Sequence, residues 1–372
     1  MSARFLTAVS GRAFNMRDRF GREIDYMRIS VIDSCNLNCY YCNPQDNNKN
    51  CQAINILSVK KVLCIVRAAT RLGITHFRLT GGEPLLHPQI DEMVSQIKKI
   101  PGVRSVSLTT NAVLLAQHAK QLKEAGIDSI NVSLDTIDAS EYEHITKKPL
   151  LHKVEQGIDA AIECGIRVKI NAVLTPQTDV VALTRYASKK GTDIRFIEMM
   201  PVGEGHTNGV EPYEKVIGAL LEVYGTPCHI DTENREEINS GYNNSDNGPA
   251  EYYSFHGLNI RVGLIQAIHG KFCDTCNRIR VTADGRLMPC LGSSVTMDLV
   301  PDSCEFTDDL EKDFVIVQAL KAAIKAKPGC HNFNDNAVTF TKTTKTKTVE
   351  TKTTELKAAE VNAARNMSRI GG

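Results

Sequence analysis

The residues that decide the fold are Cys35-Asn-Leu-Asn-Cys39-Tyr-Tyr-Cys42-Asn-Pro44. Three cysteines are separated by three and then two residues, directly after a strand-like run over residues 26–32. Thiolates are soft ligands that suit iron–sulfur clusters or zinc. A cubane cluster normally takes four cysteines, so three local ligands leave one iron open for chemistry. The alternatives are a zinc knuckle with a distant fourth ligand, which structural zinc requires, or cysteines that only fill space.

The composition is that of an ordinary globular protein. The 372 residues carry 44 Lys and Arg against 43 Asp and Glu, which gives no electrostatic basis for binding nucleic acid or an anionic membrane. No apolar run reaches membrane-spanning length. The chain has 12 cysteines and no secretory signal, so its cysteine clusters indicate metal or redox sites rather than disulfides.

Short β-branched runs alternate with helical stretches between residues 26 and 197. The candidate strands cover residues 26–32, 76–79, 105–109, 129–134, 168–173 and 194–197, and the helix-like segments lie near 58–72, 89–99, 115–125, 151–164 and 178–189. This alternation indicates βαβ units and a parallel sheet. Six repeats predict an α/β fold, a partial TIM-like (β/α)6 barrel, in which ligands gather beyond the carboxyl ends of the strands.

Glycines and polar residues stand at the predicted strand ends. The second strand runs into Gly81-Gly82-Glu83-Pro84, where two glycines allow a backbone to approach a ligand closely. An ordinary strand-to-helix turn is the alternative for this segment taken alone. Arg28, Arg78 and Lys169 lie on the first, second and fifth strands, so they can converge on one cavity, where arginine's planar fork suits phosphate.

A second cysteine group follows much later in the chain. Cys273 and Cys276 are joined by Cys290, which returns on a predicted hairpin with Asp284-Gly285 at its turn. A zinc ribbon would normally show two paired cysteine motifs, whereas here only one cysteine returns. A zinc site completed by His269 remains the alternative.

These motifs together resemble the GTP 3′,8-cyclase family of molybdenum cofactor biosynthesis, within the radical S-adenosylmethionine (SAM) superfamily. The resemblance runs from about Arg17 to Cys290 and returns in the terminal Gly371-Gly372. Its most specific segment is Cys273-Asp-Thr-Cys-Asn-Arg-Ile-Arg280. It implies the radical SAM form of the barrel, with a C-terminal extension that carries a second cluster.

The resemblance also implies a role for individual residues. The residues implied for the SAM-cleaving [4Fe–4S] cluster are Cys35, Cys39 and Cys42. Those implied for a second [4Fe–4S] cluster, whose open iron contacts guanine, are Cys273, Cys276 and Cys290. The SAM-lining residues implied are Tyr41, Gly82, Ser133 and Met200. The GTP-binding residues implied are Arg28, Arg78, Thr109, Lys169, Arg278 and Arg280.

The family reaction begins with reductive cleavage of SAM to a 5′-deoxyadenosyl radical. That radical takes the 3′ hydrogen of GTP, and the ribose carbon then attacks C8 of guanine. The resemblance further implies an external electron donor and a downstream cyclic pyranopterin monophosphate synthase, with a homodimer as an option. We expect a cytoplasmic location. A mitochondrial matrix location is the alternative, because the first 17 residues carry three arginines and no acid.

The expected domain limits are an N-terminal extension over 1–20, the barrel over 21–205, a C-terminal region with the second cluster over 206–330, a low-complexity linker over 331–365 and a glycine tail over 366–372. The linker contains a Thr/Lys tract over 341–354 that has little apolar content and is typical of a disordered or solvated linker. The chain departs from the family pattern at Ala112, where glycine is usual and where a methyl group matters if φ is positive. It departs again at His87-Pro88, where the family usually has an arginine.

Two rival interpretations stay open. A different radical SAM enzyme, such as a peptide- or protein-maturing one, would keep the first cluster but need no ring of cations. A non-catalytic metal-stabilised binding protein would hold metal without an open iron.

Overall fold

The computed structural model describes residues 16–42, 54–200, 213–229, 248–270, 272–293, 295–299 and 309–331. The strands are β1 (Tyr26–Ser30), β2 (His76–Thr80), β3 (Ser105–Thr110), β4 (Ser129–Ser133), β5 (Arg167–Val173), β6 (Asp193–Ile197), β7 (Cys228–His229), β8 (Glu251–Ser254), β9 (Val262–Ile265), β10 (Arg278–Val281), β11 (Arg286–Met288) and β12 (Met297–Asp298). The helices are α1 (Val59–Thr70), α2 (Ile90–Lys98), α3 (Leu115–Glu124), α4 (Ala139–Thr146), α5 (Leu151–Glu163), α6 (Val180–Lys190), α7 (Tyr213–Tyr224) and α8 (Asp309–Ala326).

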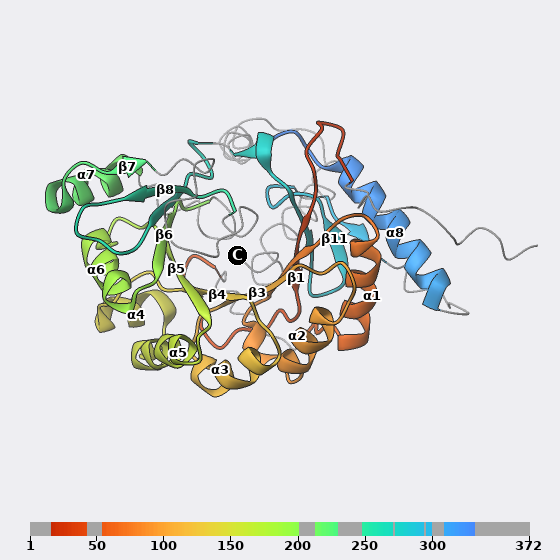
Figure 1. Ribbon diagram of the computed structural model, residues 1–372, viewed down its shortest axis with the longest axis horizontal. Helices are drawn as coiled ribbons and strands as arrows, with labels where there is room; N and C mark the ends of the chain where they lie inside the picture. The colour runs from red at the N-terminus through yellow and green to blue at the C-terminus, as the bar shows by residue number, and fades with distance from the viewer. Residues whose placement is uncertain are drawn as a thin grey trace, which may run out of the picture.

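The six predicted barrel strands are confirmed. Strands β1 to β6 pair in sequence order, and every pair is parallel. Figure 1 shows them as an arc with α1 to α6 along its outer side. Within the described part of the chain, the sheet ends at β12 and β7 without these strands pairing, so the barrel is open, as a partial barrel must be.

The C-terminal region extends both edges of this sheet. Strand β10 pairs parallel with β1, and β9 pairs parallel with β6. The hairpin predicted around Asp284-Gly285 is confirmed, because β10 and β11 are antiparallel and Gly285 has a φ of +83°. The second cysteine group therefore comes to lie beside the first strand of the barrel. The domain limits given above remain a prediction.

Alternation along the strands separates the core from the site. On β1, Met27 and Ile29 are fully buried toward the helices, while Tyr26, Arg28 and Ser30 alternate with them. Successive side chains of a strand point to opposite faces, so the polar set lines the concave side of the arc. The apolar set packs against the outer helices and forms the core.

The predicted helices are confirmed, and local caps fix several starts. Ser58, Asp138 and Asp179 each accept a backbone N–H in the first turn of α1, α4 and α6. Helix α4, which the periodicity did not predict, is only 8 residues long. The tract over 341–354, the glycine tail and residues 1–15 lie outside the described residues. No helix in the ranges given above is long and apolar enough to cross a membrane.

Candidate active site

The first cysteine loop leaves the end of β1 and is held by α4. The backbone N–H of Asn38 donates to Thr146 O at 3.0 Å, and that of Tyr40 donates to Ile145 O at 3.1 Å. Both acceptors are carbonyls at the C-terminal end of α4, which the helix itself leaves unpaired. The loop thus has a fixed shape although its cysteines are partly exposed to solvent.

The glycines after β2 bring two backbones into contact. A Cβ atom on Gly81 would lie 2.3 Å from Ile32 O, and one on Gly82 would lie 2.3 Å from Ser34 O. The Gly82 N–H donates to Ile32 O at 2.8 Å, which closes the contact. No larger residue fits at either position, so the glycines fix the cysteine loop against the end of β2.

Glu83 connects this turn to the cysteine loop. Its carboxylate accepts hydrogen bonds from Thr110 Oγ1 and Asn111 N at 2.7 Å and from Leu85 N at 3.0 Å. Burial raises its pKa to about 7, against the effect of these donors. Asn111 Nδ2 in turn lies 3.7 Å from Cys35 Sγ. Glu83 and Asn111 were not predicted as site residues, although both lie in motifs that the sequence displays.

Tyr41 is fixed by a buried carboxylate. Its hydroxyl donates to Asp135 Oδ2 at 2.5 Å, and Asp135 Oδ1 accepts from Val173 N at 2.8 Å. Burial and the Asp135 carboxylate raise the pKa of Tyr41 well above its ordinary value. The tyrosine therefore stays protonated and holds the last turn of the cysteine loop against β4 and β5. Ser133, at the end of β4, is exposed on the same side of the sheet.

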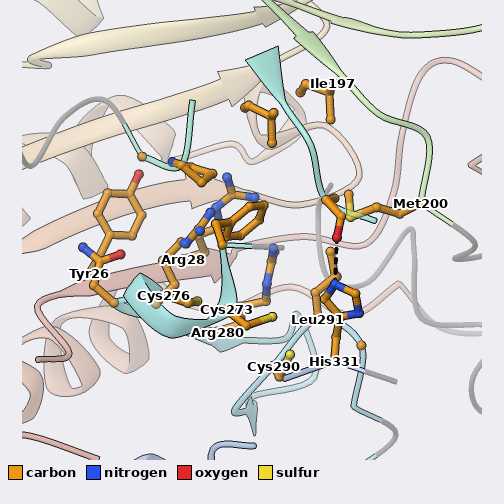
Figure 2. A pocket seen from close by; sticks show the side chains of 18 of the residues that line it. Tyr26, Arg28, Ile197, Met200, Cys273, Cys276, Arg280, Cys290, Leu291 and His331 are labelled. Carbon is orange, nitrogen blue, oxygen red and sulfur yellow. Dashed lines mark hydrogen bonds between the residues drawn. The ribbon is translucent and has the colours of Figure 1, made fainter. Parts of the chain in front are cut away.

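A large pocket opens on the concave side of the arc. It contains most of the residues predicted to bind GTP, the second cysteine group, and Met200, which was predicted to line SAM: Arg28, Arg78, Thr109, Arg278, Arg280, Cys273, Cys276, Cys290 and Met200. Figure 2 shows the three cysteines together at one side of the pocket, with Arg28 and Arg280 beside them and Ile197 across from them. The first cysteine loop, Gly82 and Ser133 are not among its lining residues.

Three arginines form a row across neighbouring strands. Arg28 on β1 is in register with Arg280 on β10 and with Arg78 on β2. Burial, and then the charges of Arg280 and Arg78, lower the pKa of Arg28 well below its ordinary value. Arg28 Nε is buried and has no hydrogen-bond partner within the described ranges. Like charges held this close in a buried site create a strong demand for an anion.

The second cysteine group faces this row. Cys273 begins a short 3₁₀ turn, and the Cys276 N–H closes it on Cys273 O at 3.2 Å. Burial raises the pKa of Cys273, and the neighbouring thiols Cys290 and Cys276 raise it further. At Cys276 burial acts in the same direction, but Arg278 and Lys327 outweigh it and bring the pKa down to about 7. Three thiols that line one pocket beside fixed cations fit an iron–sulfur cluster with one open iron.

The zinc alternative finds no support in the geometry. His269, its suggested fourth ligand, is not among the residues that line the pocket with Cys273, Cys276 and Cys290. Its Nδ1 is bonded to the buried Glu198, which also accepts the backbone N–H groups of Ile268 and His269. Across the described residues, no three His, Cys, Asp or Glu side chains are grouped to hold a metal ion. Sulfurs that bind separate corners of a cluster stand further apart than ligands of one ion, so the cluster interpretation is unaffected.

Several pocket residues were missed by the sequence reasoning. They are Tyr26, Asn131, Asn171, Arg195, Lys327 and His331. Asn131 and Asn171 lie at alternating polar positions of β4 and β5, and this alternation is the signal in the sequence that could have identified them. Arg195 Nε donates to Asn171 Oδ1 at 2.9 Å. Lys169, by contrast, is 2% exposed and is not among the residues that line the pocket.

An open parallel barrel with three cysteines after its first strand and Gly-Gly-Glu-Pro after its second defines the radical SAM class. Residues 29–183 match the family model of the Radical SAM superfamily, and residues 192–333 match that of Molybdenum Cofactor Synthesis C. Two curated relatives named GTP 3′,8-cyclase are each 36% identical to the chain. That from Clostridium perfringens (strain SM101 / Type A) aligns over 322 residues, 86% of this chain and 95% of the relative. That from Listeria monocytogenes aligns over 320 residues, 85% and 92%.

Solved structures give the same fold. Streptococcus suis SuiB bound to S-adenosylmethionine superposes with a TM-score of 0.55 at 16% identity, covering 82% of this chain and 68% of SuiB. That similarity concerns the fold alone. On the curated relatives, the chain belongs to the GTP 3′,8-cyclase family.

Proposed function

We propose that this chain converts GTP to (8S)-3′,8-cyclo-7,8-dihydroguanosine 5′-triphosphate, the first step of molybdenum cofactor biosynthesis. The observation that carries the proposal is the row of Arg280, Arg28 and Arg78 beside the second cysteine group in one pocket. A triphosphate needs fixed, desolvated cations, and a purine needs an adjacent recognition surface. A peptide substrate would need no such row.

Two [4Fe–4S] clusters and SAM serve this reaction. Cys35, Cys39 and Cys42 would hold the first cluster, which supplies the electron that splits SAM into methionine and a 5′-deoxyadenosyl radical. Tyr41, Gly82, Ser133 and Met200 would position SAM. Gly82 does so through a backbone that lacks a side chain at a close contact, and Tyr41 through its bond to Asp135.

The triphosphate would be bound by four arginines, Arg28, Arg78, Arg278 and Arg280. They would also orient the base toward the second cluster. That cluster would be held by Cys273, Cys276 and Cys290. Thr109 would supply a hydroxyl from the end of β3, and Lys169 on β5 would supply a positive charge. The walls of the barrel keep water from the reacting ribose, which matters because a carbon radical is easily quenched. An external electron donor, a downstream cyclic pyranopterin monophosphate synthase, homodimer formation and a cytoplasmic location belong to the same proposal.

The test is anaerobic. The reconstituted chain receives SAM, dithionite and one nucleotide at a time, and 5′-deoxyadenosine and the nucleotide product are quantified. Release of 5′-deoxyadenosine that depends on GTP and not on ATP, with GTP cyclised, is expected. Cys39→Ala abolishes it, whereas Cys164→Ala, at a half-buried cysteine outside both groups, does not. SAM cleavage indifferent to GTP would favour another radical SAM enzyme, and no cleavage with both clusters loaded would remove the enzyme interpretation.

A further inference from the structure

A buried lysine follows the last described helix. Lys327 comes directly after α8 and is 3% exposed. Its ammonium nitrogen donates to Arg278 O at 2.8 Å, to Pro289 O at 3.0 Å and to Cys276 Sγ at 3.4 Å. A lysine ammonium has three donors, and each of these has an acceptor here. Burying such a charge is costly unless its site uses it, so the arrangement calls for a reason.

The three acceptors belong to both arms of the second cysteine group. Arg278 begins β10, two residues after Cys276, while Pro289 immediately precedes Cys290 on the far side of the hairpin. One side chain therefore joins the arm that carries Cys276 to the arm that carries Cys290. It also places a positive charge against one of the sulfurs that would bind iron.

A second buried cation holds the backbone that carries Lys327. Arg22 donates to Pro328 O at 2.6 Å, to Gly329 O at 3.1 Å and to Cys273 O at 2.6 Å, while its Nε is paired with the buried Asp18 at 2.6 Å. Arg22 thus also connects the segment after α8 to Cys273, the remaining cysteine of the group. The position of the Lys327 ammonium is set from both sides.

We propose that Lys327 is a positioning residue of the second cluster, which fixes the geometry of its cysteines and stabilises the reduced cluster. This inference rests on the proposed presence of that cluster. Reduction adds one electron, and so one negative charge, to the cluster and its thiolates. A cationic N–H donor at a ligand sulfur favours this more negative form and raises the reduction potential. The same contacts hold the cysteines in place for cluster assembly.

The experiment uses the full-length chain with Cys35, Cys39 and Cys42 replaced by alanine, so that iron–sulfur signals come from the second site alone. Three substitutions are then made in this background. K327M removes the charge and the donors, K327Q keeps a neutral donor, and K327R keeps both the charge and the donors. K325M, the same change at an exposed lysine two residues earlier, is the matched control. Each protein is reconstituted with iron and sulfide and titrated with dithionite under electron paramagnetic resonance. No SAM or GTP is present, so a failure of the cyclase proposal cannot affect the readout.

The reduction potential should fall from the unsubstituted protein through K327R and K327Q to K327M, with K325M unchanged. The rate of iron loss to a chelator should rise from the unsubstituted protein through K327R and K327Q to K327M, where it should be several-fold faster. Should K327M assemble no second cluster while K327R does, the positioning role is supported directly. An unchanged potential and iron retention in K327M would overturn the proposal. So would equal losses in all three Lys327 variants, because that pattern reports packing rather than charge and donation.

Discussion

The buried charge of Arg28 does not stabilise the ligand-free fold. It lies between Arg78 and Arg280 in register, and its Nε has no partner among the residues described. Each guanidinium opposes ionisation of the next in a buried site. Such an arrangement destabilises the ligand-free chain and is offset only when an anion arrives. The arginine row is thus a feature of function at the expense of stability.

Replacing Arg28 with glutamine should therefore stabilise the ligand-free protein but weaken its binding of GTP. We expect R28Q to raise the melting temperature of the ligand-free protein, because repulsion is relieved. It should weaken GTP binding by about 10- to 100-fold, since a hydrogen bond to a charged group contributes about 1.5–3 kcal/mol. Thermal unfolding and calorimetric titration without reductant measure both. R104Q, at an exposed arginine, should change neither; a destabilised R28Q would contradict the argument.

Lys169 predicts a proton uptake on binding. Burial, and then the charges of Arg195 and Arg167, lower its pKa to about 6, so at pH 7 its amine is mostly neutral in the free protein. A triphosphate nearby favours the charged form, so binding takes up a proton and GTP affinity falls as pH rises above about 6. Calorimetry in buffers of different ionisation enthalpy counts the proton. K169R, charged throughout, should lack this uptake; equal uptake by both proteins would rule Lys169 out.

The backbone at Ala112, where the family usually has glycine, has the positive φ at which a methyl group matters. Its φ is +64° and it is fully buried, so the methyl group sits in the left-handed region that glycine tolerates best. A112G should raise the free energy of unfolding by about 0.5–1 kcal/mol, the strain relieved less the entropy that glycine gains when unfolded. A119G, inside helix α3, should lower it by about 1 kcal/mol or more. Urea unfolding compares the two, and a loss of stability in both would refute the prediction.

At the scale of elements, the short helix α4 does more than connect two strands. Its C-terminal carbonyls hold Asn38 and Tyr40 of the first cysteine loop, while its start is capped by Asp138, which accepts from Glu141 N at 2.8 Å. The stability of the helix and the shape of the loop are therefore linked. Fraying at one end of so short a helix reaches the other.

Removing the cap should loosen the cysteine loop. We expect D138A to speed hydrogen exchange at the Asn38 and Tyr40 amides, because their acceptors on α4 become mobile. Asp179→Ala removes the equivalent cap of α6, in which Ala182 N donates to Asp179 Oδ1, and serves as the control. Both variants should melt earlier than the unsubstituted chain. Equal exchange rates at the two amides in both variants would show that α4 does not hold the loop.

The elements that could be predicted are those whose period is visible locally. The six barrel strands show β-branched runs bounded by turns. The spacing of Cys35, Cys39 and Cys42 is enough by itself to indicate a metal-binding loop. Residues such as Lys327 and Arg195 could not be found this way. Lys327 follows an ordinary helix, and only the pairing of β10 with β1 and of β10 with β11 brings its acceptors together. Their roles depend on contacts between distant segments, which no local pattern contains.

At the scale of the whole molecule, Arg22 fastens three distant parts of the chain. It bonds Asp18 near the start, Cys273 in the second cysteine group, and Pro328 and Gly329 after α8. Both members of its ion pair are buried. Removing one partner of a buried pair leaves the other charge uncompensated.

R22M should lower the free energy of unfolding by about 3–5 kcal/mol, the usual loss for a broken buried pair. The matched control is R17M, whose partner Glu23 lies 4.0 Å away at an exposed surface, and it should cost less than about 1 kcal/mol. Urea unfolding of the reconstituted proteins measures both. A loss in R22M as small as that in R17M would contradict this account, because the substitution removes both the ion pair and the carbonyl contacts.

The pairing of β1 with β10 also has a consequence for the chain as it leaves the ribosome. Strand β1 is made early, but its second neighbour arrives only once synthesis has passed Arg280. Until then the growing sheet presents an uncovered edge, which can recruit strands of other molecules. Pairings between such distant segments also form slowly. A nascent chain halted before β10 lacks both the second partner of β1 and the arginine that completes the row, so we expect premature termination to yield an aggregating product rather than a smaller working enzyme.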